Sequence, residues 1–354
     1  APGVKKAYKR LYVTNLGKML DFLEDVEDGV ERMKALEGKI EHEYGVFPCM
    51  AWDNNYEELE LAELIKFIPE AEAKKMQDRS RKFADKEIRR KTYQAMEAFI
   101  HNLNTMHSRA GAQVPFSSIN YGTDTSPEGR LVMESVMLAT EAGLGNGETP
   151  IFPIQIFKVK EGVNYNPEDP NYDLFKLACK VSAKRLFPNF SFLDAPFNKQ
   201  YYIEGKPETE CAYMGCRTRV IGNVYDPTRE IVFGRGNLSF TSINLPRLAI
   251  KSNGNVEFFF EQLDRMIDLV IEQLLDRFKI QCKKKVRNFP FLMGQGIWLD
   301  SEKLGPDDTI EEVIKHGTLT VGFIGLAECL KALIGVHHGE FGSGNHRLYE
   351  KTHG

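Results

Sequence analysis

The chain has few cysteines and no long run of apolar residues. Its six cysteines show none of the dense, even spacing of a secreted disulfide scaffold, so we expect a reducing, cytoplasmic setting. The longest weakly charged run, residues 318–336, is interrupted by Glu328, Lys331 and three glycines. We therefore predict a strand, a turn and a helix there, and no membrane partner.

Metal-binding and phosphate-binding motifs are also missing. The pair His337-His338 does not form an HExxH motif, and the interval from Cys211 to Cys216 is too wide for a zinc knuckle. The glycine-rich segment 143–147 fits neither GxxxxGK[ST] nor GxGxxG, which favours an ordinary turn. We expect no metal ion to bind to these residues.

No charge of one sign dominates. Lysine and arginine number 46 against 50 aspartates and glutamates, which gives a net charge of -4 and a pI near 6.1. Proteins that grip nucleic-acid backbones usually carry a clustered basic excess, so we predict no nucleic-acid partner. With 354 residues, 42% of them hydrophobic, the chain can bury a core as one large or two ordinary domains.

Two kinds of segment follow one another along the chain. Residues 1–108 lack strand patterns and repeat apolar positions at helical spacing, as Ile88, Ala95 and Phe99 do, which predicts antiparallel helices. From residue 109 to 338, short β-rich runs alternate with helices, a pattern typical of βα units with a largely parallel sheet. The expected strands span residues 114–121, 151–159, 190–193, 238–245 and 318–324. One expected helix begins at Ser126-Pro127, which supply an N-terminal cap and a proline at the first helical position. Three further helices are expected over residues 170–186, 256–280 and 327–333.

The most informative segment is Met214-Gly215-Cys216-Arg217, which is followed by Gly234-Arg235-Gly236-Asn237-Leu238. A cysteine after glycine, with no CxxC partner and no nearby histidine, is a poor metal ligand and an unassisted nucleophile. One-electron chemistry is therefore favoured for Cys216.

Together with Ser108 to Phe116, Thr149 to Pro153 and Ile243 to Arg247, these segments resemble the anaerobic ribonucleoside-triphosphate reductases, a family of glycyl radical enzymes. The resemblance runs in the family's order from residue 1 to about His338. It implies that the chain is a central fragment of such an enzyme and has an α/β fold. The expected fold is an incomplete ten-stranded α/β barrel preceded by a helical segment. Residues 1–338 would form this partial catalytic barrel, mainly helical up to 108 and built of βα units from 109, and residues 339–354 form an atypical tail.

The resemblance also implies roles for particular residues. Cys216 matches the cysteine that carries a transient thiyl radical and takes the 3′ hydrogen from the ribose, and Asn237 is implied as a second catalytic residue. Gly215 would let the backbone turn tightly beside the substrate. Residues implied to contact the substrate are His107, Ser108, Arg109, Met214, Gly215 and Thr218, and Arg10 lies in a helix near the implied effector site and dimer interface.

Ordinary structural roles compete with these assignments. Asparagine often satisfies backbone groups of turns and strand ends, and on this basis we assign structure to Asn244 and function to Asn237. Arg109 and Gly111 also fit a helix C-terminal cap, so both interpretations stay open there. Solvated helix surface is the default interpretation of the region around Arg10.

The implied cofactors are a glycyl radical and zinc, both supplied by a C-terminal segment that this chain lacks, with formate as reductant or a dithiol protein in its place. The implied partners are a ribonucleoside triphosphate substrate, dNTP or ATP effectors, an activating enzyme that uses S-adenosylmethionine to generate the radical, and a second copy of the chain. Because the radical glycine is absent, we expect the isolated chain to be inactive.

Two other functions remain open from the sequence. A different glycyl radical enzyme, such as a lyase on a small metabolite, would share the barrel and the central thiol, and nucleotide binding by the intact protein would distinguish it. A non-catalytic fragment that only binds nucleotide or forms dimers belongs to another class. A radical-glycine motif in the flanking coding sequence would favour the enzyme.

Overall fold

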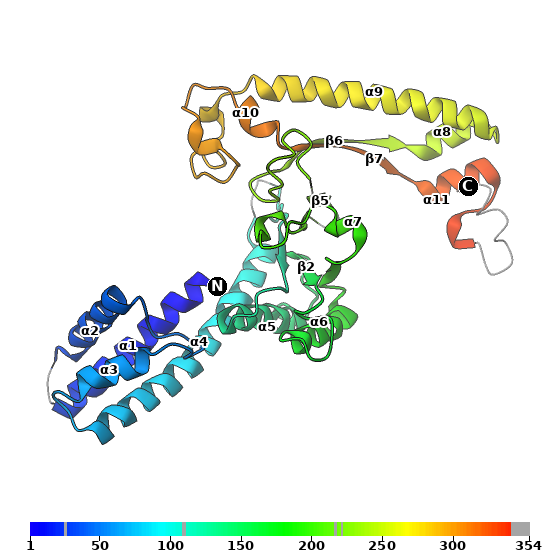
Figure 1. The fold of residues 1–354 in the computed structure, drawn as a ribbon. Helices are drawn as coiled ribbons and strands as arrows, with labels where there is room; N and C mark the ends of the chain where they lie inside the picture. Colours follow the sequence, from blue (N-terminus) through cyan, green and yellow to red (C-terminus); the bar gives the residue numbers. More distant parts are fainter. Residues whose placement is uncertain (25–26, 108–110, 216–217, 221, 341–354) are drawn as a thin grey trace. The chain divides into compact units, whose positions relative to one another are not determined.

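The chain divides into two compact units. The structure, a computed structural model, describes residues 1–24, 27–107, 111–215, 218–220 and 222–340 (Figure 1). Unit 1 consists of residues 1–200 and 211–220, and unit 2 consists of residues 201–210 and of the chain from 221 onward. Among the described helices, none combines the length and the apolar character needed to cross a membrane.

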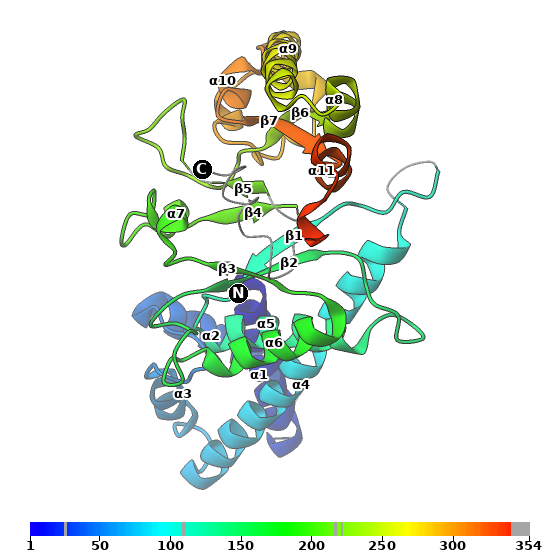
Figure 2. The same ribbon diagram turned by 90° about the vertical axis from the view of Figure 1, so that its right-hand side faces the viewer.

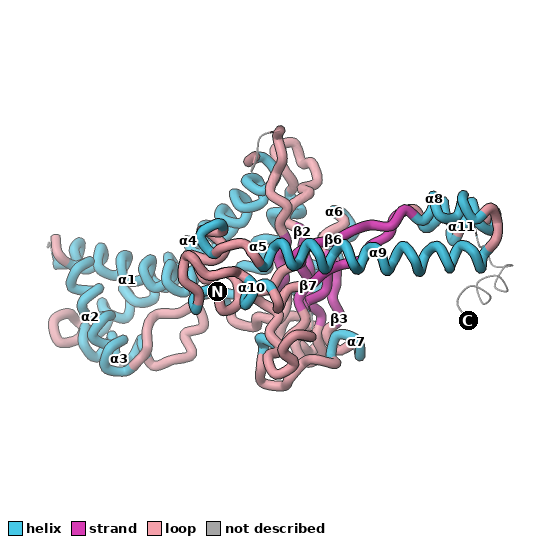
Figure 3. The backbone as a smooth tube through the Cα atoms, turned by 90° about the horizontal axis from the view of Figure 1, so that it is seen from above, coloured by secondary structure: helices cyan, strands magenta, loops and turns pink. Residues whose placement is uncertain are grey.

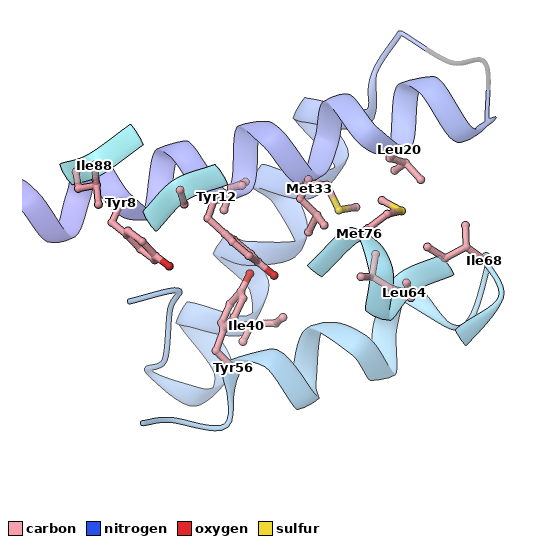
Figure 4. Packing of buried hydrophobic residues seen from close by; sticks show 14 of the residues in the cluster. Tyr8, Tyr12, Leu20, Met33, Ile40, Tyr56, Leu64, Ile68, Met76 and Ile88 are labelled. Atoms are coloured by element: carbon pink, nitrogen blue, oxygen red, sulfur yellow. The ribbon is translucent and has the colours of Figure 1, made fainter. Parts of the chain in front are cut away.

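Unit 1 begins with helices in the segment where the sequence predicts them. They are α1 (Pro2–Glu24), α2 (Gly29–Tyr44), α3 (Tyr56–Leu64) and α4 (Glu70–Thr105). Their apolar faces enclose a cluster that includes Tyr8, Tyr12, Met33, Tyr56 and Met76. Figure 4 shows Tyr12 of α1 and Tyr56 of α3 directed toward one another between the helices. This cluster, which we call the helical cluster, is the core of the first part of unit 1.

The buried face of α4 changes along the helix. Ile88 packs in the helical cluster, whereas Ile100 packs in a second core with Val136 and Met137. The expectation that Ala95 belongs to the buried stripe was wrong, since Ala95 is exposed. A fixed heptad spacing fails here because the helix passes from one partner to another.

The second core covers a parallel sheet. Its elements are β1 (Ser118–Tyr121), α5 (Pro127–Ala142), β2 (Ile154–Val159), α6 (Tyr172–Arg185) and β3 (Asn189–Phe192). The strands pair in the order β1-β2-β3, all parallel, as the sequence predicts. The predicted cap is confirmed, because the Ser126 hydroxyl accepts a hydrogen bond from the Gly129 N–H at 3.1 Å and the helix ends at Gly143.

A short hairpin completes unit 1. It consists of β4 (Ala212–Met214) and β5 (Thr218–Val220), which pair antiparallel, and α7 (Pro196–Lys199) precedes it in the chain. Figure 2 shows α5 and α6 on one side of the β1-β2-β3 sheet and the hairpin on the other. The sequence did not predict this hairpin.

Unit 2 is built around a second parallel strand pair. Its elements are η1 (Pro207–Thr209), β6 (Asn237–Asn244), α8 (Leu245–Ser252), α9 (Val256–Cys282), η2 (Val286–Asn288), η3 (Ser301–Lys303), α10 (Glu311–Ile314), β7 (Thr318–Ile324), α11 (Leu326–Ile334) and η4 (His338–Glu340). Strands β6 and β7 pair in parallel, and α9 runs alongside them (Figure 3). The helix predicted over residues 256–280 is confirmed, and Phe259, Val270 and Leu274 on it are buried in one core.

The fold is mixed α/β, as predicted. The strands of the described residues form three separate sheets of three, two and two strands. A ten-stranded barrel is therefore not formed within the described part of either unit.

Candidate active site

The hairpin presents the segment that the sequence singles out. Met214 of β4 and Thr218 of β5 are cross-strand partners and both are half-buried. Gly215 follows with a φ of 63°, in the left-handed region that favours glycine, which confirms the expected tight turn. Met214, Gly215 and Thr218 therefore come together, whereas Cys216 and its neighbour Arg217 lie outside the described residues.

Strand β1 holds the first strand of the hairpin through two side chains. The Asn120 amide donates to the Tyr213 carbonyl at 2.7 Å and accepts from the Tyr213 N–H at 2.8 Å. The Ser118 hydroxyl accepts from the Gly215 N–H at 3.0 Å. A Cβ atom on Gly215 would lie 3.2 Å from the Phe116 ring, so this position is also sterically tight.

The other end of the hairpin meets α7. The Asn198 side chain is 3% exposed, and its Oδ1 accepts hydrogen bonds from Arg219 Nη1 at 3.1 Å and from Cys211 Sγ at 3.5 Å. Its Nδ2 donates to the Phe192 carbonyl. Asn198 thereby links the residue before β4 to β5.

Asn237 is the first residue of β6 in unit 2. Its Oδ1 is buried and has no hydrogen-bond partner among the described residues, and the same is true of Oγ1 of Thr318, its cross-strand partner on β7. Buried polar atoms normally have partners, so this pair of oxygens is a candidate ligand site. Thr318 carried no signal in the sequence beyond its place at the start of a predicted strand.

Other parts of the Gly-Arg-Gly-Asn segment are structural. Arg235 Nε donates to the His316 carbonyl at 2.8 Å, and Arg235 Nη1 donates to the Ile231 carbonyl at 3.0 Å. Burial lowers the pKa of this guanidinium. These bonds anchor the loop that leads into Asn237.

The structural role predicted for Asn244 is confirmed. Its Oδ1 accepts from the Arg247 N–H at 3.1 Å and caps the first turn of α8. The remaining predicted substrate residues follow the end of α4. His107 is exposed there, and Ser108 and Arg109 lie outside the described residues.

Arg10 lines a hollow on unit 1. The hollow has a volume of about 400 Å³ and lies between α1 and α4. Its lining includes three cations, Arg10, Lys18 and Lys91, together with Thr14 and Asn15, and it includes no carboxylate. None of the three cations forms a salt bridge with a described residue, so we call this the cationic hollow.

A second hollow, of about 340 Å³, lies in unit 2 and is electrostatically balanced. Arg229 binds Asp300 through two bonds, of 2.7 and 3.0 Å, and this pairing holds the pKa of the Asp300 carboxyl well below its usual range. The buried His316 accepts from Asn223 Nδ2 at 3.0 Å through Nδ1, and burial lowers its pKa. The hollow is therefore lined by paired charges, unlike the cationic hollow.

No group of three or more histidine, cysteine, aspartate or glutamate side chains is placed to hold a metal ion within the described ranges. The two histidines at 337 and 338 contact one another edge to face.

Comparison with known families decides the relationship of this chain. The family model of the anaerobic ribonucleoside-triphosphate reductase matches residues 61–351. The chain belongs to this family. The anaerobic ribonucleoside-triphosphate reductase of Escherichia coli strain K12 is 31% identical over 274 residues, which are 77% of this chain and 36% of that protein. That of Enterobacteria phage T4 is 33% identical over 277 residues, which are 76% of this chain and 44% of that protein.

The chain thus spans well under half the length of these reductases. Among solved structures, an anaerobic ribonucleotide reductase from Thermotoga maritima with citrate in the active site aligns with 80% of this chain and 44% of its own, at 14% identity and a TM-score of 0.42.

Proposed function

We propose that this chain is part of the catalytic barrel of an enzyme that reduces ribonucleoside triphosphates to deoxyribonucleoside triphosphates. The observation that carries the proposal is the family match over residues 61–351, which contains both Cys216 and Asn237. The three-stranded parallel sheet β1-β2-β3 and the parallel strand pair β6-β7 would be segments of the ten-stranded barrel, whose other strands would belong to the rest of the protein.

In this proposal Cys216 relays a radical. Its thiol gives a hydrogen atom to a glycyl radical supplied by another segment, and the resulting thiyl takes the 3′ hydrogen of the ribose. The 2′ hydroxyl then leaves as water with one added proton. Formate gives up its hydrogen and two electrons, so that the 2′ carbon gains the hydrogen and formate becomes CO₂. The Cys216 S–H returns a hydrogen atom to the 3′ carbon, which re-forms the thiyl and, from it, the glycyl radical. Formate is proposed as the reductant, in preference to a dithiol protein, because the resemblance to the family implies it.

Asn237 is proposed to bind the ribose or the reductant. Its Oδ1 is buried and has no hydrogen-bond partner among the described residues, and the same holds for Oγ1 of Thr318, the residue that pairs with Asn237 on β7. A ribose hydroxyl would donate to such an oxygen, and the Asn237 amide nitrogen would donate to a carboxylate. His107, Ser108, Arg109, Met214, Gly215 and Thr218 are proposed to contact the substrate around the thiol.

The cationic hollow is proposed as the effector site. The three cations of the hollow form no salt bridge with a described residue and would attract a triphosphate, and Thr14 and Asn15 add hydrogen-bonding groups. The place of Arg10 in the lining of this hollow supports the effector role proposed for it. A dNTP or ATP would bind there, close to the surface through which we propose that two copies of the chain pair.

The remaining cofactors and partners stay proposals of the same kind. The radical glycine and a zinc site would belong to a separate segment of the protein, and an activating enzyme that uses S-adenosylmethionine would generate the radical. The cytoplasm is the proposed location, because these reactions need a reducing and oxygen-free setting.

The test replaces Cys216 by serine in the activated enzyme that contains these residues and measures deoxynucleotide formation without oxygen. We expect formation to stop. Cys179→Ser is the matched control, because Cys179 is exposed on α6 and should leave turnover unchanged. Undiminished turnover in Cys216→Ser would exclude the proposed radical relay.

A further inference from the structure

The hairpin that precedes and follows Cys216 is too small to hold its own position. Strands β4 and β5 contain three residues each. An isolated two-stranded hairpin is marginally stable at best in water, even when it is longer than this. The place of the Gly215 backbone must therefore be set by neighbouring elements.

Asn120 is shaped for this task. Its side-chain amide donates to the Tyr213 carbonyl and accepts from the Tyr213 N–H, so it pairs with both polar groups of one residue as a neighbouring strand would. Only a side chain with a donor and an acceptor in one amide group can make both bonds. Aspartate would lose the donor, and alanine would lose both.

Ser118 extends the same contact toward Cys216. It lies two residues before Asn120, so both side chains project from the same face of β1. Its hydroxyl accepts from the N–H of Gly215, the residue immediately before Cys216. On the hairpin, Tyr213 and Gly215 are the residues contacted, and they are also two positions apart. The spacing of the contacts on β1 therefore matches the spacing on the hairpin.

The support behind these side chains is rigid. Ser118 and Asn120 pair in register with Ile154 and Ile156 of β2, which are 7% and 3% exposed. The ring of Tyr213 packs in the same apolar cluster as these isoleucines. The hairpin is thus held by hydrogen bonds to the half-buried strand β1 and by packing of Tyr213 in a cluster with buried isoleucines of β2.

We propose that Ser118 and Asn120 are positioning residues that hold the backbone from which the Cys216 thiol reaches the ribose. The catalytic part of this inference rests on the proposed function of Cys216. Hydrogen-atom transfer requires the reacting atoms to be held in close, aligned contact, and a misplacement of about 1 Å can cost on the order of a hundredfold in rate. The three hydrogen bonds supply that alignment without contacting the substrate.

The structural part is tested by hydrogen–deuterium exchange of single amides in this chain. Asn120→Ala should speed exchange of the Tyr213 amide, and Ser118→Ala that of the Gly215 amide, each by about threefold to tenfold for the loss of one hydrogen bond. Ser118→Thr keeps the hydroxyl and should restore protection of Gly215. Ser117→Ala is the control, because the Ser117 hydroxyl donates to the Pro115 carbonyl instead. Unchanged exchange in both alanine variants overturns the proposal.

The catalytic part is tested in the activated enzyme. Asn120→Ala and Ser118→Ala should lower kcat by about tenfold or more with KM unchanged, and Ser118→Thr should recover kcat. Asn120→Asp keeps only the hydrogen-bond acceptor and replaces the alanine variant if that variant does not fold. It should lower kcat while the Tyr213 amide stays protected from hydrogen exchange.

The outcomes separate this inference from the proposed function. Faster exchange with unchanged kcat overturns the positioning role, even if Cys216→Ser is inactive. Full activity of Cys216→Ser overturns the proposed function instead, whatever the exchange rates are. Faster exchange, lower kcat and recovery by Ser118→Thr support the proposal.

Discussion

Replacing the buried Glu60 by glutamine is predicted to remove a loss of stability that the helical cluster undergoes as pH rises. Glu60 of α3 is 1% exposed, and burial raises the pKa of its carboxyl from 4.5 to about 7. Tyr12, Gln77 and Tyr56 donate hydrogen bonds to it at 2.6, 3.0 and 2.9 Å, which opposes the rise. Desolvation is nevertheless the larger effect.

The sign of the pH dependence follows from the raised pKa. Between pH 4.5 and about 7 the folded chain keeps a proton on Glu60 that the unfolded chain has released, so the free energy of unfolding falls as pH rises through this window. A shift of this size corresponds to about 3–4 kcal/mol at most, at about 1.4 kcal/mol for each pKa unit. Glutamine resembles the protonated carboxyl in shape and carries no charge, so Glu60→Gln should gain up to that amount above pH 7 and little at pH 4.5.

The assay is urea unfolding followed by Trp52 fluorescence at a series of pH values. Trp52 contacts the Tyr12 ring at 5.0 Å and therefore reports on the helical cluster. Trp298 is the other tryptophan of the chain and is replaced by phenylalanine in every sample. Glu58→Gln, on the exposed side of α3, is the control and should follow the parent chain. Parallel pH profiles for the parent and Glu60→Gln would refute the reasoning.

Four further substitutions concern glycines and the cationic hollow. A Cβ on Gly17 would lie 2.4 Å from the Val30 Cα, so Gly17→Ala should destabilise unit 1 by about 1–3 kcal/mol in urea unfolding. Gly38→Ala, with open space around it in α2, should instead stabilise by about 0.5–1 kcal/mol, and the opposite ranking would contradict the packing. Gly215→Ala should cost about 1–2 kcal/mol because of its positive φ, and an unchanged midpoint would count against that turn. Arg10→Ala should weaken dATP binding about tenfold in calorimetry at fixed salt, whereas Lys6→Ala, at an exposed position, should not. Equal affinities of Arg10→Ala and the parent chain for dATP would contradict the effector proposal.

Much of the fold could be predicted because local signals agree with the final structure. Ser126 and Pro127 predict the start of α5, and the run Thr318–Ile324 coincides with β7, since caps and β-branched runs act within a few residues. The buried stripe of α4 could not be predicted from spacing alone. It depends on which partner packs against each turn, as the exposure of Ala95 demonstrates.

The division into two units and the hairpin were also not predicted from the sequence. Residues 201–210 belong to unit 2 although residues on both sides belong to unit 1, and no composition change marks that crossing. Strands of three residues carry too little pattern to recognise, and β4 depends on the side chain of Asn120, which lies 93 positions away from Tyr213.

The candidate site was predicted through motifs rather than through local physics. Met214 and Thr218 lie side by side because β4 and β5 pair, and their contact with the substrate stays a prediction. Thr318 was missed, since its link to Asn237 arises only from strand pairing between segments about eighty residues apart. The positioning residues Ser118 and Asn120 were also missed, because their contacts are with Gly215 and Tyr213, which lie far away in the sequence.

Protection of Cys216 by substrate tests the central claim most directly. The activated enzyme, or its unactivated form, is treated with iodoacetamide with and without a ribonucleoside triphosphate, and alkylation of each cysteine is followed by mass spectrometry. The account predicts that nucleotide slows alkylation of Cys216 at least severalfold and leaves the exposed Cys179 unaffected. An identical alkylation rate for Cys216 at saturating nucleotide would contradict the claim that this thiol faces the ribose.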